Sequence, residues 1–325
     1  MKGSRQVHCW LDCYAHLIEQ TGHLDYRPMY IGVWNAAFKA DEHGIYYFSD
    51  EADAMNWPER FERLYGRSLK RWLDYGKGKK ENFALLQGLI RSMGNKGAIL
   101  VIVDLFWIPY TPQYQAKHTP HVIILKEWDR MQGQWRYEDP YLDRYGWIGH
   151  DELEAAFYYE DLAMGVLLDT SELHAPDPAQ IRLLMEEESA AGPGLLIGEV
   201  ERFLSAACGR KDGGVSKLLF SSIEQVGVIS KRMNGYAPVL QYFAGDEPGE
   251  AEAGVKGANE LVKLWESLML SLARLAVLGN RMDYSKIEGK LRELEAREAE
   301  VKAELLRVYR IWDEVTPKDE VGGRT

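Results

Sequence analysis

Three residues of types that can carry out nucleophilic catalysis are Cys9, His121 and Asp139. Cysteine catalysis needs a thiolate, a base that takes or holds its proton, and a third group that orients the base. In chain order, Cys9 would be the nucleophile, His121 the base and Asp139 the orienting carboxylate. The three residues therefore predict a cysteine-dependent enzyme, provided that the fold brings them together.

Cys9 stands at the start of a predicted helix, which Gly22 ends. A thiol in the first turn of a helix lies near exposed backbone N–H groups and the positive end of the helix dipole, and both favour the thiolate. Cys13 shares this face but lies past the helix start. The alternative is that Cys9 is a small buried hydrophobe, as most free cysteines are. The helix is predicted from the spacing of Leu11, Tyr14, Ala15, Leu17 and Ile18.

His121 and Asp139 belong to neighbouring predicted strands. His121 opens the apolar strand 121–125, and Asp139 follows the strand 135–138 after a turn at 129–134. If these strands pair antiparallel, His121 and Asp139 lie side by side at one edge of the sheet. The N-terminal helix would then pack across that edge, which is the layout of papain-like folds.

Further polar residues lie near this constellation. His118 lies in a loop, so it is a poorer fixed base, although it could contact a substrate. His8 adjoins Cys9 and is expected to point elsewhere. An oxyanion hole could come from the Gln6 amide or from the backbone N–H of Cys9. Structural or surface roles are expected for His16, His23, His43, His150 and His174.

The composition limits the class of protein. With 46% hydrophobic and 27% charged residues, the 325-residue chain is that of a globular protein with one large or two ordinary domains. A net charge of -11 argues against nucleic acid as the main partner and permits a cationic ligand such as a polyamine. No apolar run reaches the ~18 residues of a membrane span. Three cysteines and a start without an apolar leader point to a reducing cytosol, so we expect a cytoplasmic protein.

Common cofactor motifs are missing from the sequence. It contains neither the GxxxxGK[ST] nor the GxGxxG motif of phosphate-binding loops. It also lacks the CxxC and HExxH patterns that hold metal ions. We therefore expect no nucleotide cofactor and no metal site.

The pattern of the chain changes near residue 170. Residues 1–170 are mixed α/β and rich in aromatics, whereas 171–325 are almost entirely helical in pattern after a linker at 174–178. This predicts an α+β fold, with a papain-like catalytic domain at 1–170 and a helical bundle at 171–325 that caps the site or forms a homodimer. We expect strands at 44–48, 98–106, 121–125, 135–138 and 163–168, helices at 51–65, 81–93, 178–189, 194–209, 214–234, 236–244, 257–278 and 284–315, and a disordered tail at 318–325.

One stretch inverts the charge of this acidic chain. Residues 67–80 hold six basic side chains against one acid, Asp74. A solvated face is the simpler explanation. The functional alternative is a docking surface for an acidic partner. The basic residues are Arg67, Lys70, Arg71, Lys77, Lys79 and Lys80.

The catalytic pattern resembles a known group of enzymes. His8-Cys9 at a helix start, His121 before an apolar strand and Asp139-Pro140 after the next strand resemble the N-terminal domain of the butirosin-biosynthesis acyltransferase family, in the papain-like Cys/His/Asp group. The segment DYRPMYIGVW at 25–34 further resembles the petrobactin-biosynthesis acyltransferases of that group. The resemblance covers residues 5–170, and in the helical half it extends to architecture only.

The resemblance implies acyl transfer rather than proteolysis. Butirosin-type enzymes move an acyl group from the phosphopantetheine thiol of an acyl carrier protein to an amine, and petrobactin-type enzymes move a 3,4-dihydroxybenzoyl group to the polyamine spermidine. Cys9 would form the acyl-enzyme, His121 would hold the thiolate and then deprotonate the amine, and Asp139 would orient His121. No bound cofactor is implied, because the substrate arrives on phosphopantetheine. The acidic carrier protein would dock on Lys70, Arg71, Lys77, Lys79 and Lys80.

The implied substrates need an aromatic pocket for a catechol and carboxylates for a polyamine. Arg27 could hold a catechol oxygen or a phosphate, although a structural role is at least as plausible. His118 could contact the substrate, and Glu138 is a carboxylate of the expected site, with Asp50, Glu51 and Asp104 as further candidates. The expected aromatic lining is Tyr26, Tyr30, Trp34, Trp107 and Tyr110, for which core packing is the default alternative.

Two other functions fit the same sequence. The first is a cysteine peptidase or amidohydrolase on the same fold, because a fold alone does not decide the reaction. The second is a non-catalytic scaffold protein, in which Cys9 is inert and the long C-terminal helices mediate association. Release of free acid would favour the hydrolase, and a Cys9 no more reactive than Cys208 would favour the scaffold.

Overall fold

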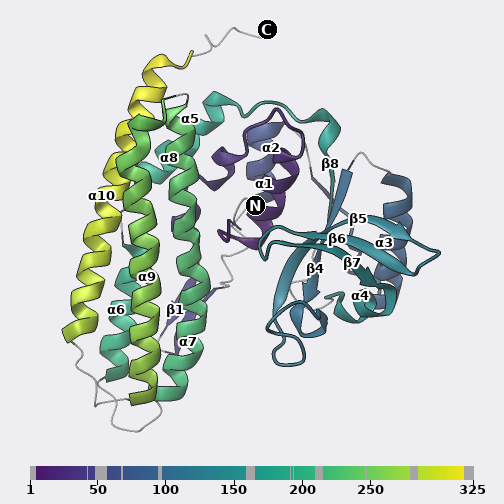
Figure 1. Cartoon of the computed structure of the whole chain (residues 1–325), viewed down its shortest axis with the longest axis horizontal. Coiled ribbons are helices and arrows are strands. Elements are labelled where there is room, and N and C mark those ends of the chain that lie inside the picture. Colours follow the sequence, from purple (N-terminus) through teal and green to yellow (C-terminus); the bar gives the residue numbers. More distant parts are fainter. Residues whose placement is uncertain are drawn as a thin grey trace. The chain divides into compact units, whose positions relative to one another are not determined.

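The computed structural model of the chain describes residues 5–41, 43–47, 57–66, 69–93, 97–158, 165–190, 192, 194–208, 215–245, 247–278 and 285–317. The chain forms two compact units, coloured along the sequence in Figure 1. The first unit holds Met1–Met29 and Trp57–Asp177, and the second holds Tyr30–Asn56 and Pro178–Thr325. Each unit therefore combines two separate segments of the sequence.

A six-stranded antiparallel sheet forms the centre of the first unit (Figure 1). All eight residues of β4 are buried, as expected of the continuous apolar run that the sequence shows there. β5 pairs with β4 on one side and with β6 on the other. In their order across the sheet the strands are β3 (Lys70–Arg71), β8 (Gly165–Asp169), β4 (Gly97–Asp104), β5 (Pro120–Asp129), β6 (Gln134–Asp139) and β7 (Arg144–Gly149).

Helices cover both faces of this sheet. On one face, Ile123 of β5 packs with Phe83 of α3 in the main core, and strand alternation places His121 on this face. On the other face, Glu138 of β6 contacts His16 of α1. The helices of this unit are α1 (Cys9–Glu19), α2 (Trp57–Tyr65), α3 (Lys79–Met93) and α4 (His150–Ala156).

The second unit is mainly helical. α9 and α10 lie side by side, and α8 packs against both (Figure 1). Their apolar stripes meet in a core that includes Leu261, Trp265, Leu294 and Leu305, all almost fully buried. The helices are α5 (Pro178–Ala190), α6 (Leu195–Cys208), α7 (Val215–Ser230), α8 (Tyr236–Ala244), α9 (Glu252–Leu278) and α10 (Ser285–Val315).

A short hairpin of β1 (Lys39–Asp41) and β2 (Gly44–Tyr46) belongs to this helical unit. The backbone N–H of Ile45 donates to the hydroxyl of Ser222 at 3.3 Å. The guanidinium of Arg232 donates to the carbonyl of Ala36 at 2.6 Å. Residues 30–56 are therefore grouped with the second unit, whereas the sequence pattern predicts a continuous domain at 1–170.

The mixture of helix and sheet agrees with the predicted α+β class. The predicted helix at 51–65 is observed from Trp57, while 51–56 and the predicted disordered tail at 318–325 lie outside the described residues. Within the described ranges, none of the helices is long and apolar enough to cross a membrane.

Candidate active site

Cys9 is the first residue of α1, and its side chain is partly exposed. His8 caps the helix: its Nδ1 accepts a hydrogen bond from the backbone N–H of Trp10 at 3.2 Å. The buried carboxylate of Asp12 accepts from the N–H of Val7 at 3.1 Å, which fixes the approach of the chain to the helix. The expectation that His8 points away from the catalytic group agrees with this capping role.

The backbone bends sharply before Cys9. Gln6 has a φ of 47°, in the left-handed region that few residues other than glycine adopt. Strained backbone of this kind often occurs at functional sites. Gln6 and the N–H of Cys9 stay as the two predicted sources of an oxyanion hole.

His121 and Asp139 lie together, as the antiparallel strands predict. Nε2 of His121 is 3.1 Å from both Oδ1 and Oδ2 of Asp139. His121 is 5% exposed and Asp139 is fully buried. This contact fixes the imidazole, because its Nε2 is shared between two carboxylate oxygens.

His121 also forms a hydrogen bond with Cys9. Since Nε2 of His121 faces Asp139, Nδ1 is the ring nitrogen left for the thiol. Burial would lower the pKa of His121, but the charge and hydrogen bond of Asp139 and the contact with Cys9 raise it to about 10. The imidazole is therefore held in the protonated form beside the sulfur.

Asp139 has two further partners. Its Oδ2 accepts from the hydroxyl of Tyr110 at 3.3 Å, and its Oδ1 accepts from the N–H of Leu142 at 3.1 Å. Burial and the charge of Asp139 raise the pKa of Tyr110, so Tyr110 stays a neutral donor. The family resemblance implies that Tyr110 lines an aromatic pocket. Its contact with Asp139 was not predicted, since the contact depends on the path of the loop after β4.

Cys13 is in a different environment from Cys9. It is fully buried, and its Sγ lies 3.8 Å from the carbonyl oxygen of Val122. Burial raises the pKa of the Cys13 thiol well above its usual value, and Asp139 adds to the effect. Cys13 is therefore a protonated packing residue, and of the two cysteines of α1 it is Cys9 that is available for chemistry.

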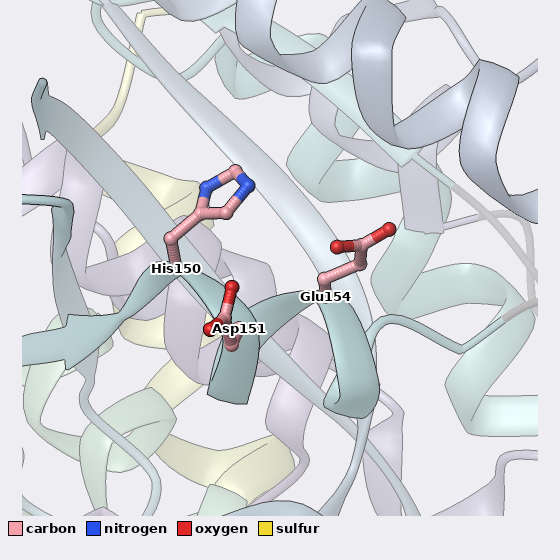
Figure 2. A group of neighbouring side chains, drawn as sticks. All are labelled: His150, Asp151 and Glu154. Atoms are coloured by element: carbon pink, nitrogen blue, oxygen red, sulfur yellow. The ribbon is translucent and has the colours of Figure 1, made fainter.

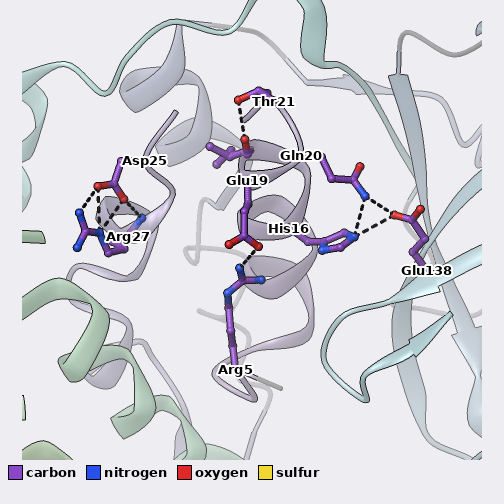
Figure 3. Close-up of polar contacts among 9 residues, drawn as sticks. Arg5, His16, Glu19, Gln20, Thr21, Asp25, Arg27 and Glu138 are labelled. Carbon is purple, nitrogen blue, oxygen red and sulfur yellow. Dashed lines mark hydrogen bonds and ion pairs between the residues drawn. The ribbon is translucent and has the colours of Figure 1, made fainter. Parts of the chain in front are cut away.

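Tyr26 and Arg27 take part in local contacts. The guanidinium of Arg5 lies 4.2 Å from the centre of the Tyr26 ring. Nε of Arg27 donates to both oxygens of Asp25 at 2.9 and 3.0 Å (Figure 3). This bidentate pair explains a structural role for Arg27, while its predicted contact with substrate stays a prediction.

The other predicted aromatic residues are divided between the two units. Tyr30 and Trp34 are buried in the second unit, where Trp34 stacks on Tyr236 and donates from Nε1 to Glu188 at 2.5 Å. Trp107 belongs to the first unit and is 42% exposed. Core packing thus accounts for Tyr30 and Trp34, and Trp107 is the one of these three that presents surface for a ligand.

Glu138 forms hydrogen bonds with α1 and with Gln20, the residue that caps this helix. Its Oε2 accepts from Nε2 of His16 at 3.0 Å and from the Gln20 amide at 2.9 Å (Figure 3). Burial would raise the pKa of Glu138, but the hydrogen bond from His16, the charge of Lys126 and the hydrogen bond from Gln20 lower it. Glu138 therefore joins α1 to β6 as a carboxylate.

His118 has a carboxylate partner that the sequence analysis does not predict. Its Nδ1 is 2.5 Å from Oδ2 of Asp104, at the end of β4. The sequence indicates His118 as a loop residue near the site and Asp104 as a carboxylate for a polyamine, without pairing them. Asp50 and Glu51, the two remaining candidate carboxylates, lie outside the described residues.

The side chains of the basic stretch differ in their exposure and in their contacts. Lys70 and Arg71 are exposed on β3 at the edge of the sheet, and Lys80 is exposed on α3. Nζ of Lys77 is 3.0 Å from the Asp74 carboxylate, and Nζ of Lys79 donates to the carbonyl of Ala155 at 2.9 Å. Arg67 is outside the described residues.

In the described part of the chain, one group has the composition of a metal site: His150, Asp151 and Glu154 (Figure 2). Nδ1 of His150 already accepts from the indole of Trp135 at 3.2 Å. The group follows β7 at the end of the strand opposite to Asp139, because Gly149 pairs with Gln134. It therefore lies apart from the His121–Asp139 pair.

Comparison with known proteins covers nearly the entire chain. Residues 4–173 match the DUF6005 N-terminal domain, and residues 189–322 match the DUF6005 C-terminal domain. Petrobactin synthase of Bacillus anthracis is 23% identical over 326 residues, which are 98% of this chain and 98% of that protein. The two matched domains meet near the end of the sheet-containing unit. The chain therefore belongs to the DUF6005 family.

Proposed function

We propose that this protein is a cysteine-dependent N-acyltransferase of siderophore biosynthesis. The observation that carries the proposal is the geometry of His121, which contacts both oxygens of a buried Asp139 and hydrogen-bonds the helix-terminal Cys9. A helix-borne cysteine facing a strand-borne histidine is the papain-like arrangement, which serves acyl transfer through a thioester. The similarity to petrobactin synthase supports a biosynthetic role.

The first half-reaction would transfer the acyl group to Cys9. The thiolate attacks the carbonyl carbon of an acyl thioester while His121 keeps the proton. When the tetrahedral intermediate collapses, the bond to the donor sulfur breaks and His121 protonates the departing thiol. Asp139 orients the ring throughout and stabilises its positive charge while His121 is protonated.

In the second half-reaction an amine would attack the thioester on Cys9. The new C–N bond forms, the C–S bond breaks, and Cys9 returns to the thiolate beside the His121 imidazolium. We propose a 3,4-dihydroxybenzoyl group delivered on the phosphopantetheine of a carrier protein as donor, and spermidine as acceptor. The net charge of -11 supports a polycationic acceptor.

The test of this function measures both the products of the reaction and their rates of formation. Purified protein is mixed with 3,4-dihydroxybenzoyl-loaded carrier protein and spermidine, and amide and free acid are quantified by mass spectrometry. Amide should dominate, and Cys9→Ala, His121→Ala and Asp139→Asn should lower its rate about 10²-fold or more. Cys13→Ala is the matched control and should stay near the wild-type rate. Free acid as the sole product would instead show a hydrolase, and full activity of Cys9→Ala would exclude the mechanism.

The carrier protein would dock on the exposed basic side chains Lys70, Arg71 and Lys80. Their joint reversal to Glu should raise the KM for the carrier about tenfold and leave the rate with a small pantetheine thioester unchanged. Reversal of Lys256, Lys263 and Lys286, three lysines of the second unit that are not buried, is the control of equal charge. An equal rise in both triple variants would show a non-specific charge effect and exclude this docking surface.

A further inference from the structure

A second histidine–carboxylate pair lies at the same end of the sheet as the catalytic pair. Asp104 ends β4 and His121 lies at the start of β5, where Val103 is paired with His121 and Asp104 with Pro120. The carboxylate of Asp104 contacts the ring of His118. The two histidine–carboxylate pairs are thus built at the same end of two neighbouring strands.

Asp104 is a fixed carboxylate. It is 8% exposed, and its Oδ1 accepts from the backbone N–H of Phe106 at 3.0 Å and of Thr119 at 2.9 Å. Its Oδ2 contacts Nδ1 of His118 at 2.5 Å. Burial would raise the pKa of Asp104, but these hydrogen bonds lower it. Because the ionised carboxylate is an acceptor, Nδ1 of His118 carries the hydrogen, and the neutral ring has its lone pair on Nε2.

His118 is held in place and yet open to solvent. Its ring stacks on Phe106 at 4.2 Å with an interplanar angle of 16°, while its side chain is 69% exposed. In contrast, His121 is buried and has both ring nitrogens engaged. His118 can therefore release a proton to bulk water, which His121 cannot do directly.

The position of Asp104 relates this pair to Cys9. Strand alternation places Asp104 on the face of Ile102 and Val122, opposite to that of His121. α1 packs on this face, where the Sγ of Cys13 contacts the backbone of Val122. Asp104 therefore starts from the face of the sheet on which α1 packs, one residue along β4 from Val103, the partner of His121.

Proton counting in the proposed reaction shows which proton a second base would take. An alkylamine enters as an ammonium ion and must lose two protons to become a neutral amide nitrogen. Release of Cys9 as a thiolate leaves one proton for His121, which restores the ion pair. The other proton goes either to water before the amine binds or to a second base at the site.

We infer that His118 is the general base that deprotonates the acceptor ammonium before it attacks the thioester on Cys9, with Asp104 as its positioning residue. This inference rests on the proposed acyltransferase function. Nε2 of His118 takes one proton from the ammonium and passes it to solvent, and His121 retains the other when the C–S bond breaks. The loop of residues 105–119 contains no carboxylate, and its exposed aromatic rings, Trp107 and Tyr114, are groups that could contact a cation.

The test separates acylation from aminolysis. Wild type, His118→Gln and Asp104→Asn are first acylated with the N-acetylcysteamine thioester of 3,4-dihydroxybenzoate, and the isolated acyl-enzymes are then mixed with spermidine or hydroxylamine. His118→Gln should acylate at the wild-type rate and discharge to spermidine about 10²-fold more slowly. Its discharge to hydroxylamine should be unchanged, because hydroxylamine is already neutral at pH 7. Asp104→Asn should show the same selectivity with a smaller loss.

Controls make the outcome decisive. His23→Gln changes another exposed histidine of the first unit and should behave as wild type in both discharges. Equal spermidine discharge by His118→Gln and wild type would overturn the inference and leave the proposed function standing. Equal slowing with both nucleophiles would also overturn it, since that would show a structural role. Failure of wild type to form any acyl-enzyme would overturn both proposals.

Discussion

His121 combines burial with a raised pKa, and this has a consequence for stability. In the unfolded chain a histidine titrates at about 6.5, whereas the pKa of His121 in the folded protein is raised to about 10. The folded protein therefore binds a proton more tightly than the unfolded chain does. The resulting stabilisation is fully present below pH ~6.5 and is lost as the pH rises to about 10.

We accordingly predict that the free energy of unfolding declines between pH 7 and pH 10 more steeply in wild type than in His121→Gln. The variant lacks the titrating group, so subtracting its pH profile isolates the contribution of His121 from those of other side chains. Urea unfolding at pH 6, 8 and 10 measures both profiles. Parallel profiles would show that the contact with Asp139 does not raise the pKa of His121.

The two cysteines of α1 should differ in reactivity. Iodoacetamide at pH 7 is predicted to label Cys9 in the native protein and to leave Cys13 unmodified, because Cys13 is buried and its thiol is held protonated. Peptide mass spectrometry after a time course measures both sites, and labelling in urea provides the fully accessible reference. If Cys9 reacted no faster than Cys208, the thiolate mechanism would lose its basis.

The contact between His121 and Asp139 was predictable from the sequence because both residues border strands joined by a short turn. The hydrogen bond from Tyr110 and the pair of Asp104 with His118 were not predicted. Both depend on the loop of residues 105–119, whose conformation has no periodic signal. Sequence patterns thus predict contacts between residues at strand ends better than contacts made by residues of irregular loops.

At the scale of elements, the position of α1 matters most because this helix carries Cys9. Glu138 of β6 accepts hydrogen bonds from His16 and Gln20 on the helix, and Gln20 also accepts from Lys126 of β5 at 2.9 Å. Arg5 is 2.6 Å from Glu19 at the other side of the helix (Figure 3). The contacts of Glu138 and Lys126 hold α1 against the strands that carry His121 and Asp139.

Glu138→Gln should therefore lower the free energy of unfolding by about 1–3 kcal/mol at pH 7 and slow the acylation of Cys9. Since the pKa of Glu138 is lowered in the folded protein, its contribution is present above pH ~4.3 and is lost as the pH falls further. Thermal and urea unfolding at pH 7 and pH 3 measure the difference. Glu127→Gln, an exposed position on β5, is the control and should change stability by less than ~0.5 kcal/mol. Equal stability of Glu138→Gln and wild type at pH 7 would contradict the account.

Element prediction succeeded where the pattern was strong and failed for identifiable reasons. β7 was not predicted because two of its six residues are glycine, and α4 spans only seven residues. α9 begins at Glu252, earlier than the predicted 257, because Gly254 permits close packing inside the helix: a Cβ there would lie 2.7 Å from Cγ of Glu304. Gly254 is thus a packing residue of α9.

At the scale of the whole molecule, the main feature that the sequence did not predict is that residues 30–56 belong to the helical unit. The buried Arg232 donates to the carbonyls of Ala36 and Ala37, and Glu188 accepts from Trp34 and Asn35. These partners are separated by more than a hundred residues, so no local pattern reports them. The predicted boundary near residue 170 follows the change in composition, whereas the compact units also follow these distant contacts.

A chain that ends after Asp177 should consequently be unstable. It keeps residues 30–56 but loses the partners of Trp34 and Ala36, which leaves apolar surface and backbone groups uncovered. We expect increased binding of a hydrophobic dye and no cooperative thermal transition. Truncation after residue 317 is the control and should melt like the full chain. A cooperative melt of the 1–177 fragment would show that residues 30–56 do not need the helical unit.

The most direct test of the central claim is the intact mass of the protein after mixing with 3,4-dihydroxybenzoyl-loaded carrier protein in the absence of amine. We predict a covalent gain of one 3,4-dihydroxybenzoyl group on wild type and on Cys13→Ala, none on Cys9→Ala, and loss of the group as the amide when spermidine is added. An adduct of equal yield on Cys9→Ala, or amide formation by Cys9→Ala at the wild-type rate, would contradict acyl transfer through Cys9.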